Sequence, residues 1–219
     1  IINESKEMII KKLPLGPIEA NTYIIFDEKS KEAVVIEASG NAQKIKEELS
    51  TLNAKLKYIL LTHGHFDHVF ALNELKELYP DAKAFLNKND KPLIEHVATQ
   101  CAHFGIGAIE EPKIDEYVDE NSALEFANIK IKPIHTPGHS KGSMCYLIEN
   151  ELFSGDTLFF EEIGRCDLFG GDFSEIEKSI REKIFTLDKN TIVHPGHGHD
   201  TTVAHEIKYN AYFGENSRY

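Results

Sequence analysis

The residues Thr62-His63-Gly64-His65-Phe66-Asp67-His68 decide how the rest of the chain is interpreted. Before them, residues 56–61 form a short apolar run that predicts a buried strand. After them, the leucines of residues 72–78 keep helical spacing until Pro80 ends the pattern. The stretch therefore lies at the turn from the C-terminal end of a strand into a helix, where α/β folds bind their ligands.

Three imidazoles and one carboxylate within six residues would repel one another if they were simply buried. A divalent cation removes that problem, because each of these groups can become a ligand. His63 and His65 are two residues apart and can project to the same side of an extended segment. Asp67 and His68 then turn toward a neighbouring point. The stretch predicts two adjacent metal positions that residues from elsewhere complete; the alternative is a polar, histidine-rich surface loop.

The composition is typical of a soluble globular protein. The 219 residues are 41% hydrophobic and 27% charged, so they can bury one sizeable core, and we expect a single domain over residues 1–219. No apolar run approaches the roughly 20 residues that span a bilayer. Residues 1–7 contain no signal-peptide pattern, although an N-terminal segment could have been removed from a chain that begins with Ile1. A reduced, cytoplasmic setting is favoured by the odd number of cysteines, which are Cys101, Cys145 and Cys166.

The net charge of −12 bears on the partners of the protein. It opposes attraction to phosphate backbones and to anionic membranes, so neither nucleic acid nor a membrane is expected as a partner. A small local basic patch could still bind an anionic substrate. We therefore expect a small-molecule substrate, and the sequence gives no oligomeric state.

The first half of the chain predicts strands followed by helices. Strands are expected within residues 8–37, an amphipathic helix from Asn41 to Leu52, and a further strand at residues 83–86. Asp90 is expected to cap a helix in which Leu93, Val97 and Cys101 share one face. His96 and His103, in or near this helix, are expected to be surface or packing histidines. Residues 105–121 are acidic and loop-like, and we expect them to form a flexible cover near the site.

The second half repeats the order of strands and then helix. Strand pairs are expected at residues 124–131 and 144–153, and a last strand at residues 191–193. Ser174 and Glu177 have the spacing of a capping box and predict a helix start, and a final helix is expected from about Thr202. The two halves together predict two sheets with helices outside both.

Further metal-ligand residues follow the expected strand ends. After residues 63–68 come His139, Asp156 and His197, so that the clusters together supply five imidazoles and two carboxylates. This arrangement resembles the metallo-β-lactamase superfamily, whose signature is His-x-His-x-Asp-His followed by a distant His, an Asp and a last His. The resemblance covers nearly the whole chain, and four motifs matching in order are far more specific than any one of them.

The resemblance implies an α/β fold, the four-layer αββα sandwich, and two metal ions. In that family His63, His65 and His139 would hold the first ion, and Asp67, His68 and His197 the second, with Asp156 bridging both. Neutral imidazoles and carboxylates suit zinc best here, with iron or manganese as alternatives. A single anionic bridge lets two cations approach to roughly 3.5–4 Å.

Two such ions lower the pKa of a shared water toward neutrality, and the resulting hydroxide is the implied nucleophile. Asp67 would orient this hydroxide. A covalent cysteine mechanism is the competing idea, but no cysteine lies beside a plausible base in the sequence.

Within the superfamily, residues 136–140, 155–159 and 163–167 look like those of glyoxalase II, the hydroxyacylglutathione hydrolases. The resemblance implies that Arg165 contacts substrate, and the alternative is a structural salt bridge with Asp167. His199, where the family has a tyrosine, could also meet substrate. The sequence lacks the C-terminal helical domain of full-length glyoxalase II and thus looks like the short glyoxalase II-like proteins, in which glutathione recognition is reduced.

The function that we expect from the sequence is metal-dependent hydrolysis of a small thioester such as S-lactoylglutathione. One alternative is a persulfide dioxygenase of the same fold, with one iron on residues matching His63, His139 and Asp156. A hydrolase of another small ester or lactone is chemically similar. A nuclease is disfavoured by the acidic balance, and a noncatalytic binding module is the least expected class.

Overall fold

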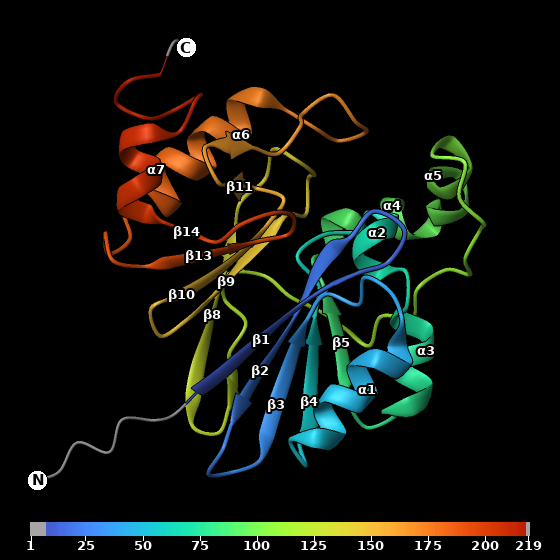
Figure 1. Cartoon of the computed structure of the whole chain (residues 1–219). Helices are drawn as coiled ribbons and strands as arrows, with labels where there is room; N and C mark the ends of the chain where they lie inside the picture. Colours follow the sequence, from blue (N-terminus) through green and yellow to red (C-terminus); the bar gives the residue numbers. More distant parts are fainter. Residues whose placement is uncertain (1–7, 218–219) are drawn as a thin grey trace, which may run out of the picture.

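The computed structural model describes residues 8–217, so the stretch Ile1 to Glu7, where no signal-peptide pattern was found, lies outside the described residues. Within them, two six-stranded sheets face each other (Figure 1). The first has the order β1-β2-β3-β4-β5-β6 and the second the order β14-β13-β10-β9-β8-β7. A two-stranded ribbon of β11 and β12 lies beside them.

The first sheet changes from antiparallel to parallel at β3. Strands β1 to β3 pair antiparallel, and β3 to β6 pair parallel. Its strands are β1 (Met8–Leu15), β2 (Ala20–Asp27), β3 (Glu32–Ile36), β4 (Lys55–Leu60), β5 (Lys83–Leu86) and β6 (Glu116–Tyr117).

The second sheet is antiparallel except for the parallel pair β10 and β13. Its strands are β7 (Leu124–Phe126), β8 (Ile129–His135), β9 (Met144–Ile148), β10 (Glu151–Gly155), β13 (Ile192–Pro195) and β14 (Thr201–Thr202). The ribbon comprises β11 (Leu158–Phe159) and β12 (Glu162–Ile163).

Helices cover the outer face of each sheet (Figure 1). On the side of the first sheet they are α1 (Ala42–Thr51), α2 (Phe66–Val69), α3 (Leu72–Leu78), α4 (Lys91–Glu95) and α5 (Val97–His103), with the 3₁₀ turn η1 (Lys88–Asp90) before α4. On the side of the second sheet they are α6 (Phe173–Ser179), its π-helical continuation η2 (Ile180–Ile184), and α7 (Val203–Tyr209).

Three apolar layers hold these four layers of structure together. Successive residues of a strand point to opposite faces, and β2 shows the result: Ile24 and Phe26 pack under the helices, while Tyr23 and Ile25 pack between the sheets. The third layer joins the second sheet to α6 and α7. The sequence prediction of a four-layer αββα sandwich is therefore confirmed.

The fold brings five loops to one edge of the molecule. Each follows the carboxyl end of a strand, namely β3, β4, β8, β10 and β13. The parallel pairs β3/β4 and β10/β13 place their carboxyl ends side by side, so residues that are far apart in the sequence meet there.

Two predicted helix starts were wrong. Asp90 precedes α4 but its side chain caps no helix, and the expected single helix is divided at His96 into α4 and α5. Helix α6 begins at Phe173 because the Asp172 carboxylate accepts the backbone N–H of Glu175 at 2.9 Å. Glu177 instead accepts Arg181 Nε at 2.9 Å, so no capping box forms with Ser174.

Residues 105–121 do not form the expected flexible cover. Glu116 and Tyr117 add the edge strand β6 to the first sheet, pairing with Phe85 and Leu86. None of the residues 105–121 lines the cavity at the metal-ligand cluster.

Among residues 8–217, no helix combines the length and the apolar character that crossing a membrane requires.

Candidate metal centre

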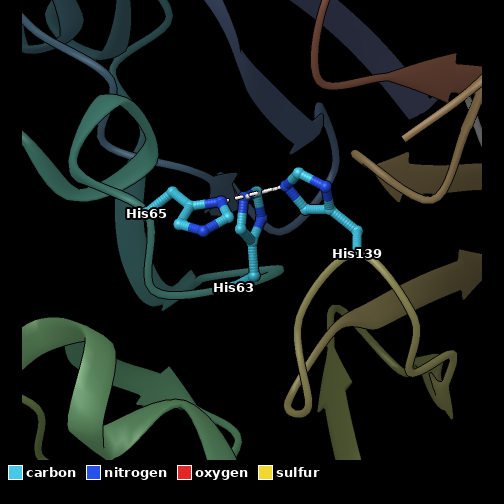
Figure 2. A group of neighbouring side chains, drawn as sticks. All are labelled: His63, His65 and His139. Atoms are coloured by element: carbon cyan, nitrogen blue, oxygen red, sulfur yellow. Dashed lines mark hydrogen bonds between the residues drawn. The ribbon is translucent and has the colours of Figure 1, made fainter. Parts of the chain in front are cut away.

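Three histidines from two loops converge on one point (Figure 2). His63 and His65 follow β4, and His139 lies in the loop after β8. His139 Nε2 lies 3.2 Å from His63 Nε2 and 2.9 Å from His65 Nδ1. All three side chains are buried, so the sequence spacing and the fold together form a compact group of imidazole nitrogens.

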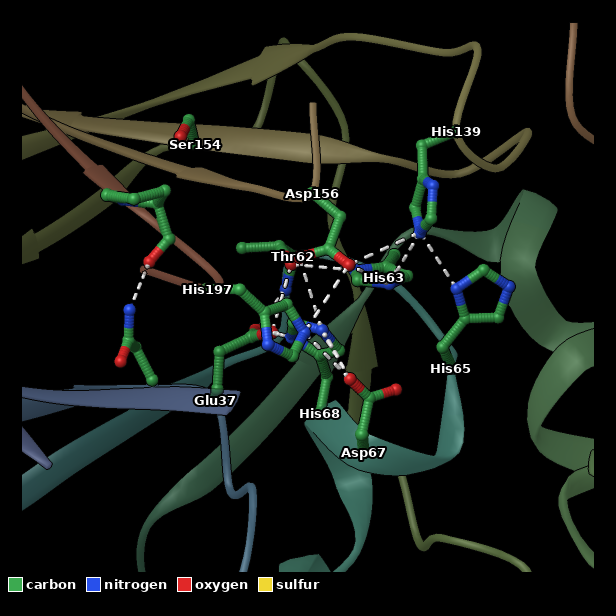
Figure 3. Close-up of polar contacts among 12 residues, drawn as sticks. Glu37, Thr62, His63, His65, Asp67, His68, His139, Ser154, Asp156 and His197 are labelled. Atoms are coloured by element: carbon green, nitrogen blue, oxygen red, sulfur yellow. Dashed lines mark hydrogen bonds and ion pairs between the residues drawn. The ribbon is translucent and has the colours of Figure 1, made fainter. Parts of the chain in front are cut away.

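A second group adjoins the first (Figure 3). Asp67 Oδ2 lies 3.0 Å from His197 Nε2 and 3.1 Å from His68 Nε2. Asp67 and His68 belong to α2, whereas His197 follows β13, 130 residues further along the chain. The ligand atoms of Asp67, His68, Asp156 and His197 all lie within 4.8 Å of one another.

Asp156 lies between the two groups (Figure 3). Its Oδ2 is 3.5 Å from His139 Nε2 and 3.7 Å from His197 Nε2. Its Oδ1 is 3.3 Å from His68 Nε2. A β-carbon at Gly196 would overlap Asp156 Oδ1, so only glycine allows the loop after β13 to approach this carboxylate. The structure thus brings together all seven residues that the sequence proposed as metal ligands.

The outer ring nitrogens of these histidines are held by oxygen atoms. Thr62 Oγ1 donates to Glu37 Oε2 at 3.0 Å, so the 2.9 Å contact between Thr62 Oγ1 and His63 Nδ1 must use the proton of the histidine. His139 Nδ1 donates to the Arg165 carbonyl at 2.8 Å. These bonds leave the inner Nε2 atoms of His63 and His139 with lone pairs that face each other.

The chemistry of this donor set fits two cations. Two lone pairs at 3.2 Å cannot bond to each other, and a shared cation satisfies both. Within the part of the chain that the structure describes, two buried atoms of the second group, His68 Nε2 and Asp156 Oδ1, have no hydrogen-bond partner, although such atoms are normally paired. Nitrogen and carboxylate ligands without sulfur suit zinc, iron or manganese.

The pKa values of the buried histidines and of Asp156 also favour a bound cation. Burial, and then the neighbouring imidazoles, lower the pKa of His63 well below its usual value, and burial and His139 lower that of His65 to about 3. Both rings are therefore neutral ligands near pH 7. Burial would raise the pKa of Asp156, but His68 and other imidazoles outweigh it and lower this pKa to about 2.

Burial would likewise lower the pKa of His68, but the carboxylates of Asp67, Asp156 and Glu37 raise it well above its usual value. Positive charge is therefore favoured at the second group, and a divalent cation would supply it.

Glu37 is a functional residue that the sequence interpretation missed. It is 1% exposed and its carboxylate contacts His68 Nδ1, accepts the Thr62 N–H at 2.6 Å and accepts the Thr62 hydroxyl. Its φ of +67° lies in the left-handed region, which residues other than glycine rarely adopt. A signal was present, since an acidic residue directly follows the apolar strand 33–36 at its carboxyl end.

Asp90 is the second residue whose role was missed. Its buried carboxylate accepts the N–H of Gly64 at 3.0 Å, the N–H of Gly142 at 2.6 Å and the hydroxyl of Ser140 at 2.7 Å. Gly64 lies between His63 and His65, and Ser140 follows His139. Asp90 therefore ties together the two loops that carry the first histidine group.

A cavity of about 770 Å³ opens onto the metal-ligand cluster, and Arg165 is among its lining residues. The guanidinium of Arg165 also makes the alternative interaction expected from the sequence, with Nε and Nη2 at 2.6 and 2.7 Å from the Asp167 carboxylate. His199 does not line the cavity; it is exposed and its ring lies 6.2 Å from that of Phe160. His96 and His103, expected to be surface or packing residues, do line the cavity.

The sequence is similar to a known protein family and to individual proteins. A family model described as the metallo-beta-lactamase superfamily matches residues 15–197. An uncharacterised protein of Aquifex aeolicus (strain VF5) is 38% identical over 95% of this chain and 98% of its own length. The protein named hydroxyacylglutathione hydrolase GloC, of Haemophilus influenzae (strain ATCC 51907 / DSM 11121 / KW20 / Rd), is 33% identical over 96% of this chain and 100% of its own length.

Solved structures show the same architecture. BLEG-1 B3 metallo-beta-lactamase superimposes with a TM-score of 0.87 and 34% identity, covering 94% of this chain and 99% of its own. TTHA1623, solved in a di-iron-bound form, has a TM-score of 0.82 and 32% identity, covering 92% and 99%. ETHE1 from Myxococcus xanthus has a TM-score of 0.77 and 26% identity, covering 96% and 87%.

Proposed function

The chain belongs to the metallo-beta-lactamase superfamily, and from this membership we propose that it is a hydrolase that uses two divalent metal ions to cleave a small thioester. His63, His65 and His139 would hold one ion, and Asp67, His68 and His197 the other. Asp156 would bridge them. We propose this activity for residues 1–219 as one metallo-β-lactamase-like domain.

The observation that most supports the proposal is the convergence of one ligand atom from each of five imidazoles and two carboxylates (Figure 3). The other ring nitrogens of His63 and His139 donate hydrogen bonds to oxygen atoms of the protein. When bound, two cations supply a water that is deprotonated near neutral pH and an electrophile that polarises a carbonyl. Zinc is the metal that we test first, followed by iron and manganese.

The residues of the chain then orient the reaction. Asp67 lines the cavity, and its carboxylate can accept a hydrogen bond from the attacking water. His197 also lines the cavity and is fixed by the 3.0 Å contact with Asp67. Thr62 and Glu37 keep His63 and His68 in one orientation, so the ligand set is organised before substrate arrives.

S-lactoylglutathione is the reference substrate, because the resemblance to glyoxalase II and the relative named hydroxyacylglutathione hydrolase GloC both point to it. Arg165 would contact the substrate from the cavity wall. His199 lies outside this wall, so we do not assign it a substrate contact.

The experiment is metal removal with a chelator, followed by reconstitution with zinc, iron(II) or manganese while thiol release from S-lactoylglutathione and simpler thioesters is followed. We expect the stripped protein to be inactive and activity to return with the second equivalent of metal. His197→Gln should prevent this recovery. The matched control His194→Gln, in the strand β13 that precedes His197 and paired with Glu151, should recover. Turnover by the stripped protein, or none on any thioester with two ions bound, would reject the proposal.

A persulfide dioxygenase is the second candidate, and one geometric observation favours it. His63 Nε2 and His139 Nε2 lie 4.0 and 3.5 Å from Asp156 Oδ2, so two histidines and one carboxylate could hold a single iron with open positions. Iron at one equivalent per chain, with oxygen consumption on glutathione persulfide and no thioester turnover, would favour this candidate. Activity that requires a second ion would favour the hydrolase.

A further inference from the structure

The walls of the cavity at the metal centre are mainly apolar outside the ligand residues. Hydrocarbon side chains come from α2, α4, the end of α5, the ribbon β11–β12, and the loops before β2 and α6. They are Ile18, Phe66, Pro92, Leu93, Phe104, Phe159, Ile163, Leu168 and Phe169. A cavity of about 770 Å³ with such walls suits a ligand with a large hydrocarbon part.

Two polar residues in the same walls form hydrogen bonds to the protein itself. Gln100 accepts the N–H of Phe66 at 3.0 Å and donates to the Leu93 carbonyl at 2.7 Å. His96 Nδ1 contacts the Pro92 carbonyl at 2.8 Å. These contacts help to maintain the walls and use part of their hydrogen-bonding capacity within the protein.

Outside the metal-ligand cluster, the cavity walls carry little positive charge. Among the described residues that line it, none is a lysine, and Arg165 is the one with a permanent positive charge. Both of its donating contacts go to Asp167, whose carboxylate cancels that charge. The net charge of the whole chain, −12, adds repulsion for anions.

Large apolar side chains stand exposed around the mouth of the cavity. Phe169 is 70% exposed, Ile18 44% and Phe104 43%, and all three belong to the lining. Exposed apolar groups that gather at one place mark a surface that a ligand covers. A hydrocarbon chain leaving the metal centre would cover Phe104 and Phe169.

A glutathione thioester matches these walls poorly. It carries two carboxylates and one ammonium group, and charged groups placed against apolar walls without partners are costly to bind. We infer that the cavity selects an uncharged thioester or ester whose hydrocarbon part lies against Phe104 and Phe169, in preference to a glutathione conjugate. The inference rests on the proposed hydrolase function and narrows its substrate class. Water adds across the C–S bond: a C–O bond forms, the C–S bond breaks, and the thiolate takes the proton.

The test uses two series of simple thioesters with the metal-loaded protein. One series is N-acetylcysteamine thioesters with acyl chains from acetyl to octanoyl, and the other is acetyl thioesters of alkanethiols of increasing length. Burial of each added methylene should raise kcat/KM about fourfold in at least one series. The longest thioester of that series should exceed S-lactoylglutathione in kcat/KM.

Alanine variants test whether Phe169 and Phe104 cause the dependence of kcat/KM on chain length. Phe169→Ala and Phe104→Ala should flatten the dependence of kcat/KM on chain length, whereas a uniform loss of activity would leave the slope unchanged. Phe160→Ala is the matched control, because Phe160 is 41% exposed but does not line the cavity. All three side chains are surface-exposed, and the slope against chain length does not depend on the amount of folded protein.

Flat dependences in both series, or faster turnover of S-lactoylglutathione than of every uncharged thioester, would overturn the inference and leave the hydrolase function standing. An equal slope in Phe169→Ala, Phe104→Ala and the wild type would also overturn it. Absence of turnover on every thioester with two ions bound would instead reject the proposed function, and the inference with it.

Discussion

At the scale of single residues, the centre depends on the hydrogen bonds that orient the proposed ligand histidines. These bonds are made to the ring nitrogens that face away from the centre. The Thr62 hydroxyl, the Arg165 carbonyl and the Glu37 carboxylate contact the outer nitrogens of His63, His139 and His68 in turn. A carboxylate acceptor makes an imidazole more basic than a neutral oxygen acceptor does. Glu37 should therefore strengthen metal binding at the second position, through His68, more than Thr62 or the Arg165 carbonyl strengthens it at the first.

Replacement of Glu37 tests this difference. Glu37→Gln should weaken binding of the second ion about 10- to 100-fold, because His68 loses a charged partner and its fixed orientation. Competition with a chromophoric chelator measures the affinity. Glu151→Gln is the matched control, since Glu151 pairs with His194 at 2.6 Å and not with a proposed ligand. Equal metal affinity in Glu37→Gln and in the control would contradict the role given to Glu37.

Among residues 8–217, Asp156 is the one carboxylate placed to serve both proposed metal positions. Asp156→Ala should therefore prevent two ions from binding together and lower kcat/KM by more than about 100-fold. The effect should be larger than that of Glu37→Gln, because Asp156 would bind the ions directly, whereas Glu37 only contacts a ligand. Elemental analysis and a thioester assay on one sample check both expectations. A variant that keeps two ions and full turnover would refute the assignment.

His194 gives a prediction about pH that does not depend on metal. Burial would lower its pKa, but Asp200 and Glu151 outweigh burial and raise it. A raised pKa in the folded protein means that charged His194 stabilises the fold below its unfolded pKa of about 6.5, and that this contribution is lost as the pH rises through the folded value. Urea unfolding in chelator should therefore show a larger loss of stability in His194→Gln at pH 6 than at pH 9. An equal loss at both values would contradict the ion pairs.

At the scale of elements, Asp90 connects structures that the sequence separates widely. It ends η1, and its carboxylate binds the loop after β4 through Gly64 and the loop after β8 through Ser140 and Gly142. Gly142 must be a glycine, because a β-carbon there would overlap the Asp90 carboxylate. One buried side chain therefore bonds directly to both loops that carry His63, His65 and His139.

Asp90→Ala should lower the free energy of unfolding by about 3 kcal/mol or more, since three buried donors lose their acceptor. Unfolding is measured in chelator, so that bound metal does not add to the stability of either protein. Asp172→Ala, which removes a helix cap from α6, should cost only about 1 kcal/mol and serves for comparison. A smaller loss for Asp90→Ala than for Asp172→Ala would show that Asp90 does not hold the loops.

Asp90 also explains why helix starts were harder to predict than strands. Its position before Pro92 and an apolar pattern is that of a cap, yet its carboxylate serves two distant loops. Asp172 and Ser174 are both suitable caps by residue type, and only the extended backbone of Asp172 decided between them. Local sequence gives the residue types for a cap but not which tertiary contacts compete for them.

At the scale of the whole molecule, the αββα fold was predictable because apolar runs alternate with amphipathic patterns and several of these runs are followed by ligand-type residues. The order of these clusters along the chain already distinguished this superfamily, and all seven proposed ligands meet in the structure. The cavity was not predictable in the same way. Ile18, Phe104 and Phe169 come from three distant loops and helices, and no local pattern shows that they share one mouth.

Glu37 shows the same limit at the centre itself. The residue is polar, buried and in a left-handed conformation, three features that local propensity does not favour together. Such conflicts between local preference and the fold are expected at functional sites. The sequence therefore predicted the residues that converge at the centre, but not Glu37, which contacts one of them from outside.

The most direct test of a two-metal hydrolase is the metal content of the protein as purified, with thioester turnover assayed on the same sample. We predict two ions per chain, thiol release from thioesters, and loss of activity as the second ion is removed. A single iron per chain with no thioester turnover and with oxygen consumption on glutathione persulfide would contradict it.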